Sequence, residues 1–423
     1  MKLTPTARGI AALFSTSFIL AFGHGMTFPT IPVLADEFDI SIAFAAQIVT
    51  AYAIGRFAGT LPAGALVDHF GVRITMLLGP VLITAAALSV VVTPFFTIVL
   101  VALFVAGIGD SMWQIGREIA GIQMVRSDQR GRLMSGFMGF NSAGMAIGPV
   151  LGGVLAQLVD YRAAYLVYAG LALIILAVAL GTKSLPMERQ HHQGQPATEG
   201  AGPVSLWRRP LDWTRNIPAL VREIEPRFRT TYLVFIFATF VMMLYRFAWQ
   251  ALLPVFADAE LGLTPTEIGL LFFIMGIVVF AMIVPAGFVV DKIGRKWATV
   301  PSTGIPAIAF LTIPFADSFL HLAGIMVLMG LANGLSLGSV ATSTYDVIPS
   351  NSRGRLQALR RTVSEIGGIG GPALGGVIVS VSSPGVPFLV YAPLLVIASL
   401  LLGFVAKETL IKKPKQVFEH GPG

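Results

Sequence analysis

The sequence contains no cysteine and few charged residues. Only 12% of its 423 residues are Asp, Glu, Lys or Arg, against roughly 25% in an ordinary soluble domain. The absence of cysteine excludes disulfides, thiol nucleophiles and Cys-ligated zinc or iron–sulfur sites. The sequence also has no Gly-x-x-x-x-Gly-Lys phosphate loop and no His-Glu-x-x-His zinc pair. We therefore expect no enzyme activity, no ATP drive, no metal and no cofactor.

Long apolar stretches fill most of the chain. Apolar residues other than Gly make up 55% of it, the mean hydropathy is +0.78, and the 45 Gly and 26 Pro are scattered through these stretches. A membrane helix needs about 20 apolar residues, and the alternating pattern of a membrane barrel is missing. The sequence predicts an all-α membrane protein with twelve transmembrane helices, at residues 8–33, 42–67, 73–92, 97–122, 133–158, 163–182, 230–256, 266–290, 297–316, 319–345, 356–381 and 385–406.

Basic residues are distributed unevenly between the loops. If both termini are cytoplasmic, the outside loops hold only Arg162, together with acids such as Asp36, Glu37 and Asp258. Because Lys and Arg are retained on the cytoplasmic side, this predicts a multi-pass protein of the inner (cytoplasmic) membrane with both termini inside. The net charge of +7 then reflects the Lys and Arg residues of the cytoplasmic loops. We expect the lipid bilayer as a partner, no nucleic acid and a monomeric chain.

The chain repeats itself at an offset of 223 residues. The box from Gly64 to Arg73 recurs from Gly287 to Lys296, and Arg130-Gly-Arg-Leu133 recurs as Arg353-Gly-Arg-Leu356. Six spans in each half make the halves parallel repeats, so the binding pocket should lie between them. The expected domains are an N-terminal six-helix bundle (1–182), a cytoplasmic linker with an amphipathic segment (183–229), a C-terminal six-helix bundle (230–408) and a cytoplasmic tail (409–423).

The loop box after the second helix has the pattern Gly-x-x-x-Asp-basic-x-Gly-basic-basic. The second copy matches every position, whereas the first departs at His69 and Val72. With this box the chain, apart from about 183–229, resembles the major facilitator superfamily, most closely its 12-span drug:proton antiporters. The resemblance implies two bundles that rock about a central site by alternating access. We expect its glycines to permit close helix approach and its charges to form an ion-pair gating latch. The latch residues are Gly64, Asp68, Arg73, Gly287, Asp291, Arg295 and Lys296.

A glycine-rich box on the fifth helix, copied on the eleventh, resembles motif C of those antiporters. Gly at every fourth position lets two backbones touch, and an internal proline adds a kink. The copies consist of Gly144, Gly148, Pro149 and Gly152, and of Gly367, Gly371, Pro372 and Gly375. The box indicates either an efflux transporter or helix packing that any carrier could use. The antiporters usually carry an Arg before the Gly-x-Gly of the fourth helix, but that position is Leu103 here, so coupling through such an Arg is not expected.

Ionisable side chains are rare within the expected spans, and each is costly unless it is paired or faces water. On the fourth helix Asp110, Trp113, Gln114 and Arg117 recur at helical spacing, which predicts a cavity-facing stripe with Glu118 beside it. Asp110 and Arg117 are about 10 Å apart along the axis, so each should find a partner on another helix or on the substrate. A structural network that locks neighbouring helices is the alternative.

The seventh helix carries Arg246, Trp249 and Gln250 on one face with Met242, a mixture suited to an amphipathic or aromatic substrate. If the repeat extends back, Arg246 corresponds to His24 on the first helix. Both side chains would then face one central cavity. Hydrogen bonds between packed helices are the alternative.

Three further polar residues complete the expected cavity. Arg56 is a buried base on the second helix, and Asn333 belongs to a polar stretch of the tenth. Glu365 should pair with Arg361 on the eleventh helix and is deep enough to carry a proton. The predicted substrate and proton residues are His24, Arg56, Asp110, Trp113, Gln114, Arg117, Glu118, Arg246, Trp249, Gln250, Asn333 and Glu365.

Two transport functions fit these residues, and a non-transporting membrane receptor or scaffold on the same fold is a third possibility, which a lack of any substrate-dependent flux would favour. The first is secondary active transport by alternating access, in which protons drive the efflux of an amphipathic small molecule or drug. The second is proton-coupled uptake of a small organic anion, suggested by the three buried arginines Arg56, Arg117 and Arg246. The proton carrier would be Asp110, Glu118 or Glu365.

Overall fold

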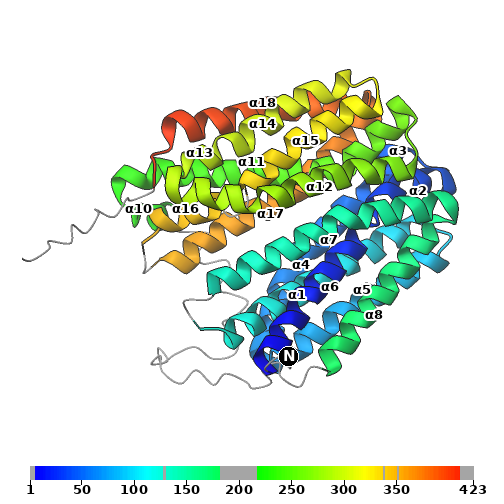
Figure 1. Ribbon diagram of the computed structural model, residues 1–423, viewed down its shortest axis with the longest axis horizontal. Helices are drawn as coiled ribbons and strands as arrows, with labels where there is room; N and C mark the ends of the chain where they lie inside the picture. Colours follow the sequence, from blue (N-terminus) through cyan, green and yellow to red (C-terminus); the bar gives the residue numbers. More distant parts are fainter. Residues whose placement is uncertain (1–4, 127–129, 182–216, 337–338, 350–351, 410–423) are drawn as a thin grey trace, which may run out of the picture.

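Twelve helices that are long and apolar enough to cross a membrane make up the computed structural model (Figure 1). The structure describes residues 5–126, 130–181, 217–336, 339–349 and 352–409, and these contain helices and no strand. The all-α fold class with twelve membrane helices is therefore confirmed.

Six spans form the first half. Its elements are α1 (Pro5–Gly25), which continues through a 3-10 turn (Phe28–Thr30) into α2 (Ile31–Glu37), then α3 (Ile42–Ala45) with α4 (Gln47–Phe70), α5 (Val72–Val92), α6 (Phe96–Met124), α7 (Arg130–Leu158) and α8 (Tyr161–Gly181).

Six more spans form the second half. After the short helix α10 (Ile217–Arg222) come α11 (Pro226–Leu261), α12 (Pro265–Phe288) with the π-helical turn η4 (Val289–Ile293), α13 (Lys296–Thr299) with α14 (Pro301–Thr312), α15 (Phe319–Ser336) with α16 (Ser339–Val347), α17 (Arg353–Val381), and α18 (Val386–Leu400) with a final π-helical turn (Leu401–Val405).

Helix boundaries repeat between the halves. Both α7 and α17 have 29 residues, and each starts with the Arg-Gly-Arg-Leu box, so they begin and end 223 positions apart. Helix α4 ends at Phe70 and η4 ends at Ile293, again 223 positions apart. The glycine that follows each of them, Gly71 or Gly294, has a positive φ of 87° or 156°. Because L side chains rarely adopt these angles, the turn in each loop box requires glycine.

The two halves are in contact at one end and separated at the other (Figure 1). The end at which α1 begins and α8 ends is called the linker end here. Near the opposite end α7 and α12 pack backbone to backbone, since a Cβ added at Gly153 would lie 2.2 Å from the carbonyl oxygen of Pro265. Nearer the linker end the same two helices are further apart, since a Cβ added at Gly139 would lie 3.8 Å from the side chain of Ile283. The halves therefore diverge towards the linker end.

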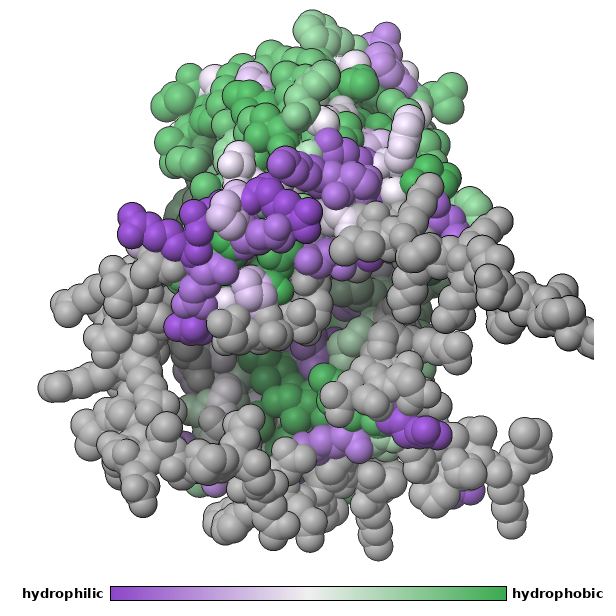
Figure 2. Space-filling view, turned by 90° about the vertical axis from the view of Figure 1, so that its left-hand side faces the viewer, coloured by the Kyte–Doolittle hydropathy of each residue, from purple (hydrophilic) through white to green (hydrophobic). Residues whose placement is uncertain are grey.

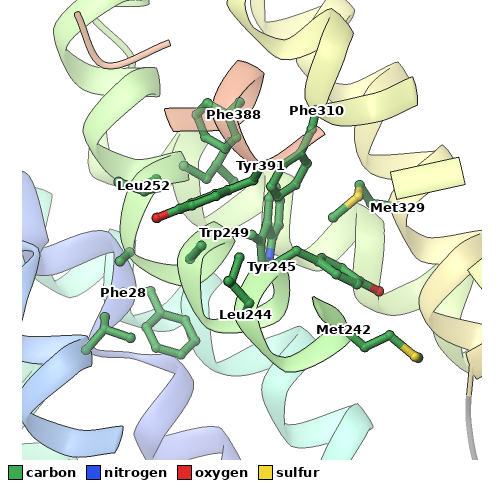
Figure 3. Close-up of a cluster of buried hydrophobic side chains, with 14 of the residues drawn as sticks. Phe28, Met242, Leu244, Tyr245, Trp249, Leu252, Phe310, Met329, Phe388 and Tyr391 are labelled. Carbon is green, nitrogen blue, oxygen red and sulfur yellow. The ribbon is translucent and has the colours of Figure 1, made fainter. Parts of the chain in front are cut away.

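A core of aromatic side chains lies mostly within the second half, with Phe28 of the first half beside it (Figure 3). Tyr245 of α11 packs edge-to-face on Phe310 of α14, and Phe310 does the same on Phe388 of α18. The hydroxyl of Tyr391 donates a hydrogen bond of 2.7 Å to the carbonyl oxygen of Gly371 in α17. Large apolar areas and a satisfied hydroxyl fix these helices as one body.

The linker is described only from residue 217. There, Leu220 and Ile224 are buried against the protein, and Arg229 donates hydrogen bonds to the carbonyl oxygens of Arg222 and Ile224. Glu223 forms an ion pair of 3.4 Å with Arg355 of α17. The expected amphipathic segment thus packs on the second half over this part, whereas residues 207–216 lie outside the described residues.

Candidate functional site

A cavity of about 420 Å³ lies between the two halves. It is lined by α1, α4, α6 and α7 on one side and by α11, α12, α15 and α17 on the other. Figure 2 looks at the linker end and shows the surface hollowed between two lobes, with apolar residues deep in the hollow. All twelve side chains named above as cavity residues line it: His24, Arg56, Asp110, Trp113, Gln114, Arg117, Glu118, Arg246, Trp249, Gln250, Asn333 and Glu365.

Arg56 is the centre of an ion cluster that joins the halves. Its Nε lies 3.5 Å from Oδ2 of Asp110 on α6, and its Nη2 lies 4.0 Å from Oε1 of Glu365 on α17. Its guanidinium carbon is 5.8 Å from the centre of the Phe247 ring of α11. Asp110 thus finds its partner on another helix, as expected. Glu365 pairs across the interface, and among the described residues no ion pair joins it to Arg361, so that expectation was wrong.

His24 sits in an aromatic pocket of the first half. Its ring stacks on Tyr52 of α4, with centroids 4.0 Å apart and planes at 18°, and meets the edge of Phe28 at 5.1 Å. Its Nδ1 is buried and has no hydrogen-bond partner. Tyr52 lies one turn before Arg56, so the stack and the ion cluster are neighbours on α4.

Arg117 is held by an uncharged neighbour on another helix. It is 5% exposed, its Nη1 donates a hydrogen bond of 2.8 Å to Oγ of Ser17 on α1, and its guanidinium lies 4.6 Å above the Phe137 ring of α7. One turn earlier on α6, the Trp113 indole nitrogen is buried without a hydrogen-bond partner. Trp113 and Arg117 therefore combine contacts between helices with a place on the cavity wall.

Arg246 both faces the cavity and ties α11 to α15. Its Nε donates a hydrogen bond of 3.0 Å to Oδ1 of Asn333, and its Nη2 donates one to Oγ of Ser336. The hydroxyl of Tyr245 also donates to Oδ1 of Asn333, at 3.3 Å. The two alternatives for Arg246 are thus both present in the structure, as a cavity position and as a link between helices.

Most of the remaining wall is apolar, apart from Asn141 and Ser142 of α7, and few of these residues were predicted from the sequence. It includes Tyr52, Phe137, Phe247, Phe272 and five methionines, Met134, Met138, Met145, Met243 and Met275. Met242, which was expected on the cavity face, is instead 5% exposed within the core. Met243 takes the cavity position because the stripe on α11 is centred near Arg246 and Gln250. The spacing of Tyr52 and Arg56, four residues apart, was a usable signal for the α4 wall.

The glycine boxes pack their helices backbone to backbone. A Cβ added at Gly148 of α7 would lie 2.1 Å from the carbonyl oxygen of Phe22 in α1, while Gly144 faces the same helix and Gly152 faces the backbone of Met26 just after it. In the second half, a Cβ at Gly371 of α17 would lie 2.1 Å from the carbonyl oxygen of Leu244 in α11. The boxes therefore act in helix packing in both halves, with Pro149 and Pro372 inside the helices.

The loop boxes lie at the linker end, where the halves are apart. A Cβ added at Gly64 or Gly287 would meet no described atom within 4 Å, so no described residue packs closely on either glycine in this conformation. The side chains of Asp68 and Asp291 lie outside the described part of the structure.

The basic residues of the second loop box have partners within their own half. Arg295 Nε lies 3.1 Å from Oδ2 of Asp346 on α16, and the backbone nitrogens of Arg295 and Lys296 donate hydrogen bonds to the carboxylate of Glu408. The Lys296 ammonium donates a hydrogen bond of 2.8 Å to the carbonyl oxygen of Gly403. Among the described residues the box is thus anchored to α16 and to the end of the last span.

The chain is similar to known proteins in sequence and to a solved structure in fold. The chain is 25% identical over 401 residues to "Multidrug resistance protein 2" of Bacillus subtilis (strain 168), covering 94% of each. It is 22% identical over 377 residues to "Multidrug resistance protein 1" of the same strain, covering 87% of this chain and 89% of that one. A solved POT family transporter in complex with 5-aminolevulinic acid superimposes with a TM-score of 0.77 over 94% of this chain. At 11% identity that likeness shows the fold alone.

A sequence model of one protein family matches both halves of the chain. The model described as Major Facilitator Superfamily matches residues 13–245 and again residues 234–421, once for each half. Together the two matches cover almost the whole chain, and the second begins where the repeat places the second half. The chain belongs to the Major Facilitator Superfamily of membrane transporters.

Proposed function

We propose that this protein is a secondary active transporter that exports amphipathic small molecules in exchange for protons. The multidrug resistance proteins that it resembles over most of its length support export. The cavity supports an amphipathic substrate, because Met and aromatic side chains give adaptable apolar contact and charged groups lie beside them. The observation that carries the proposal is the ion cluster of Arg56, which joins the two halves at this cavity.

Glu365 is the proton carrier in this proposal. Of the two carboxylates that contact Arg56, Asp110 belongs to the same half and Glu365 to the other. Protonation of Glu365 removes the charge that holds Arg56 across the interface, while Asp110 still compensates the guanidinium. A proton can therefore change how strongly the halves are held together without leaving a buried arginine uncompensated.

The linker end is the cytoplasmic end in this proposal. The excess of Lys and Arg in the loops at that end supports this orientation and a place in the inner membrane. The conformation then has its cavity directed to the cytoplasm and its halves closed on the outside. Closure at the cytoplasmic end would bring the loop boxes together, where Asp68 and Asp291 serve as the latch.

Uptake of a small organic anion with protons is the second candidate. It is favoured by two cavity arginines, Arg117 and Arg246, that have no carboxylate within 4.0 Å among the described residues. An anion entering with a proton would bring a charge that these arginines can bind.

Proton movement in proteoliposomes with an imposed pH gradient separates the two candidates. The purified chain is reconstituted, and lipophilic cations and small organic anions are added in turn while internal pH is followed. Collapse of the gradient by amphipathic compounds moving against protons supports antiport. Movement of protons in the same direction as anions supports uptake, and the absence of any response to both panels contradicts proton coupling.

A further inference from the structure

Arg117 is a buried cation without a carboxylate partner. It is 5% exposed, and among the described side chains no Asp or Glu oxygen lies within the 4.0 Å of an ion pair. Its polar contact is with the neutral hydroxyl of Ser17, and its Nε has no hydrogen-bond partner. Glu118, the next residue, lines the cavity but forms no ion pair with it. A buried charge in this condition is costly, so an anionic partner from outside the protein would be favourable.

The other two cavity arginines have more acceptor groups around them than Arg117 has. Arg56 has two carboxylates, Asp110 and Glu365. Arg246 donates two hydrogen bonds from one edge of its guanidinium, through Nε to Asn333 and through Nη2 to Ser336. Two of the three cavity carboxylates thus lie at Arg56, the third being Glu118, and Arg117 has the fewest acceptors of the three arginines.

The wall around Arg117 matches an aromatic body. Trp113 lies one turn away on α6, and the Phe137 ring lies against the guanidinium. Met134 and Met138, on the same helix as Phe137, also line the cavity. Aromatic rings and thioethers bind planar apolar groups with little demand on exact shape, and a guanidinium binds carboxylates through paired hydrogen bonds.

We propose that Arg117 receives the anionic group of the substrate and that this transporter accepts aromatic acids of amphipathic character. This inference rests on the proposed transport function and names the substrate class for the same cavity. The acid group would lie at Arg117 and the aromatic part along Trp113 and the methionines of α7. Arg117 would then be a specificity-determining residue, because it raises the affinity for the anionic one of two compounds of equal shape.

A purely structural role is the competing explanation, since Arg117 joins α6 to α1 through Ser17 and to α7 through Phe137. The two roles differ in what they do to charge selectivity. A structural arginine affects the binding of acids and of their neutral analogues equally, whereas an anion receptor affects only the acids.

The test measures binding to the purified full-length chain by calorimetry at pH 7, without any proton gradient. The probes are matched acids and amides of one size, namely 1-naphthylacetic acid against 1-naphthylacetamide and indole-3-acetic acid against indole-3-acetamide. The unmodified chain should prefer the acids, and Arg117→Gln should reduce that preference by about tenfold, the scale of a charge-assisted hydrogen bond. Arg117→Lys should retain part of the preference because it retains the charge.

Ser17→Ala is the matched control, because it removes the hydrogen bond between α1 and α6 but leaves the Arg117 charge. It should keep the preference for acids. Equal affinity for acid and amide in the unmodified chain, no binding of the acids, or equal loss of acid and amide binding in Arg117→Gln would overturn the assignment. A preference for acids in a chain that moves no protons would leave the assignment intact and contradict proton-coupled export instead.

Discussion

Replacing Glu365 by Gln should uncouple transport from protons. The carboxylate of Glu365 lies 4.0 Å from Arg56 of the other half, and the two side chains are 19% and 24% exposed. Glutamine keeps the shape of a protonated glutamic acid but cannot release the proton. The variant should therefore behave as if the carrier were always protonated, while Asp110 still compensates Arg56.

The size of the effect follows from the separation of the charges. Two unit charges 4 Å apart interact by about 1 kcal/mol in water and by about 4 kcal/mol at an effective dielectric constant near 20. A partly exposed pair falls between these limits. Because about 1.4 kcal/mol corresponds to a factor of ten, loss of the pair should shift the balance between the two conformations by roughly five-fold to several hundred-fold.

Two transport measurements test this reasoning. In proteoliposomes, Glu365→Gln should lose the response of transport to a pH gradient but keep gradient-free exchange of substrate across the membrane. Glu223→Gln is the matched control, since it breaks an ion pair with Arg355 on the exposed linker end and should transport normally. A normal gradient response in Glu365→Gln would refute the coupling role of the Arg56 pair.

Three further predictions concern packing and gating. Gly148→Ala should destabilise the protein by about 1–3 kcal/mol, since the new methyl would lie 2.1 Å from a carbonyl oxygen of α1. Gly170→Ala is the control, because a Cβ there meets nothing within 4 Å, and it should have the melting temperature of the unmodified chain. Equal melting temperatures of the two variants would contradict the packing argument. Tyr391→Phe should cost about 1 kcal/mol in a melting assay because the carbonyl oxygen of α17 loses its hydrogen bond, and an unchanged midpoint would show that this bond contributes nothing. Asp68→Asn and Asp291→Asn should each slow transport and largely spare substrate affinity, and unchanged rates in both would remove the latch.

The fold could be predicted because its signals are local or repeated. Span lengths follow from apolar stretches, and the offset of 223 residues between the loop boxes reappears in the helix boundaries of α7 and α17. The cavity side chains on α6 could be named because polar residues at helical spacing in a membrane segment must share a face.

The partners of those side chains could not be predicted, because they lie on other helices. The pair of Arg56 and Glu365 joins positions 309 residues apart, and nothing local distinguishes it from the pair of Glu365 with Arg361, which the sequence favoured and the structure lacks. The apolar wall was missed for another reason. Aromatic residues and methionines are common in protein cores and on lipid-facing surfaces as well as in cavities, so their sequence pattern does not reveal which of them line the cavity.

Alternating access requires the two ends of the cavity to open in turn, and two distances measured in one experiment show whether they do. The chain has no native cysteine, so spin labels can be attached at introduced cysteines without background. One pair, His69→Cys with Lys292→Cys, spans the halves at the linker end, and the other, Asp36→Cys with Glu260→Cys, spans them at the opposite end; all four residues are exposed. When protons or substrate shift the conformation, the linker-end distance should shorten while the opposite distance lengthens. Two distances that stay constant, or that change in the same direction, would contradict the account.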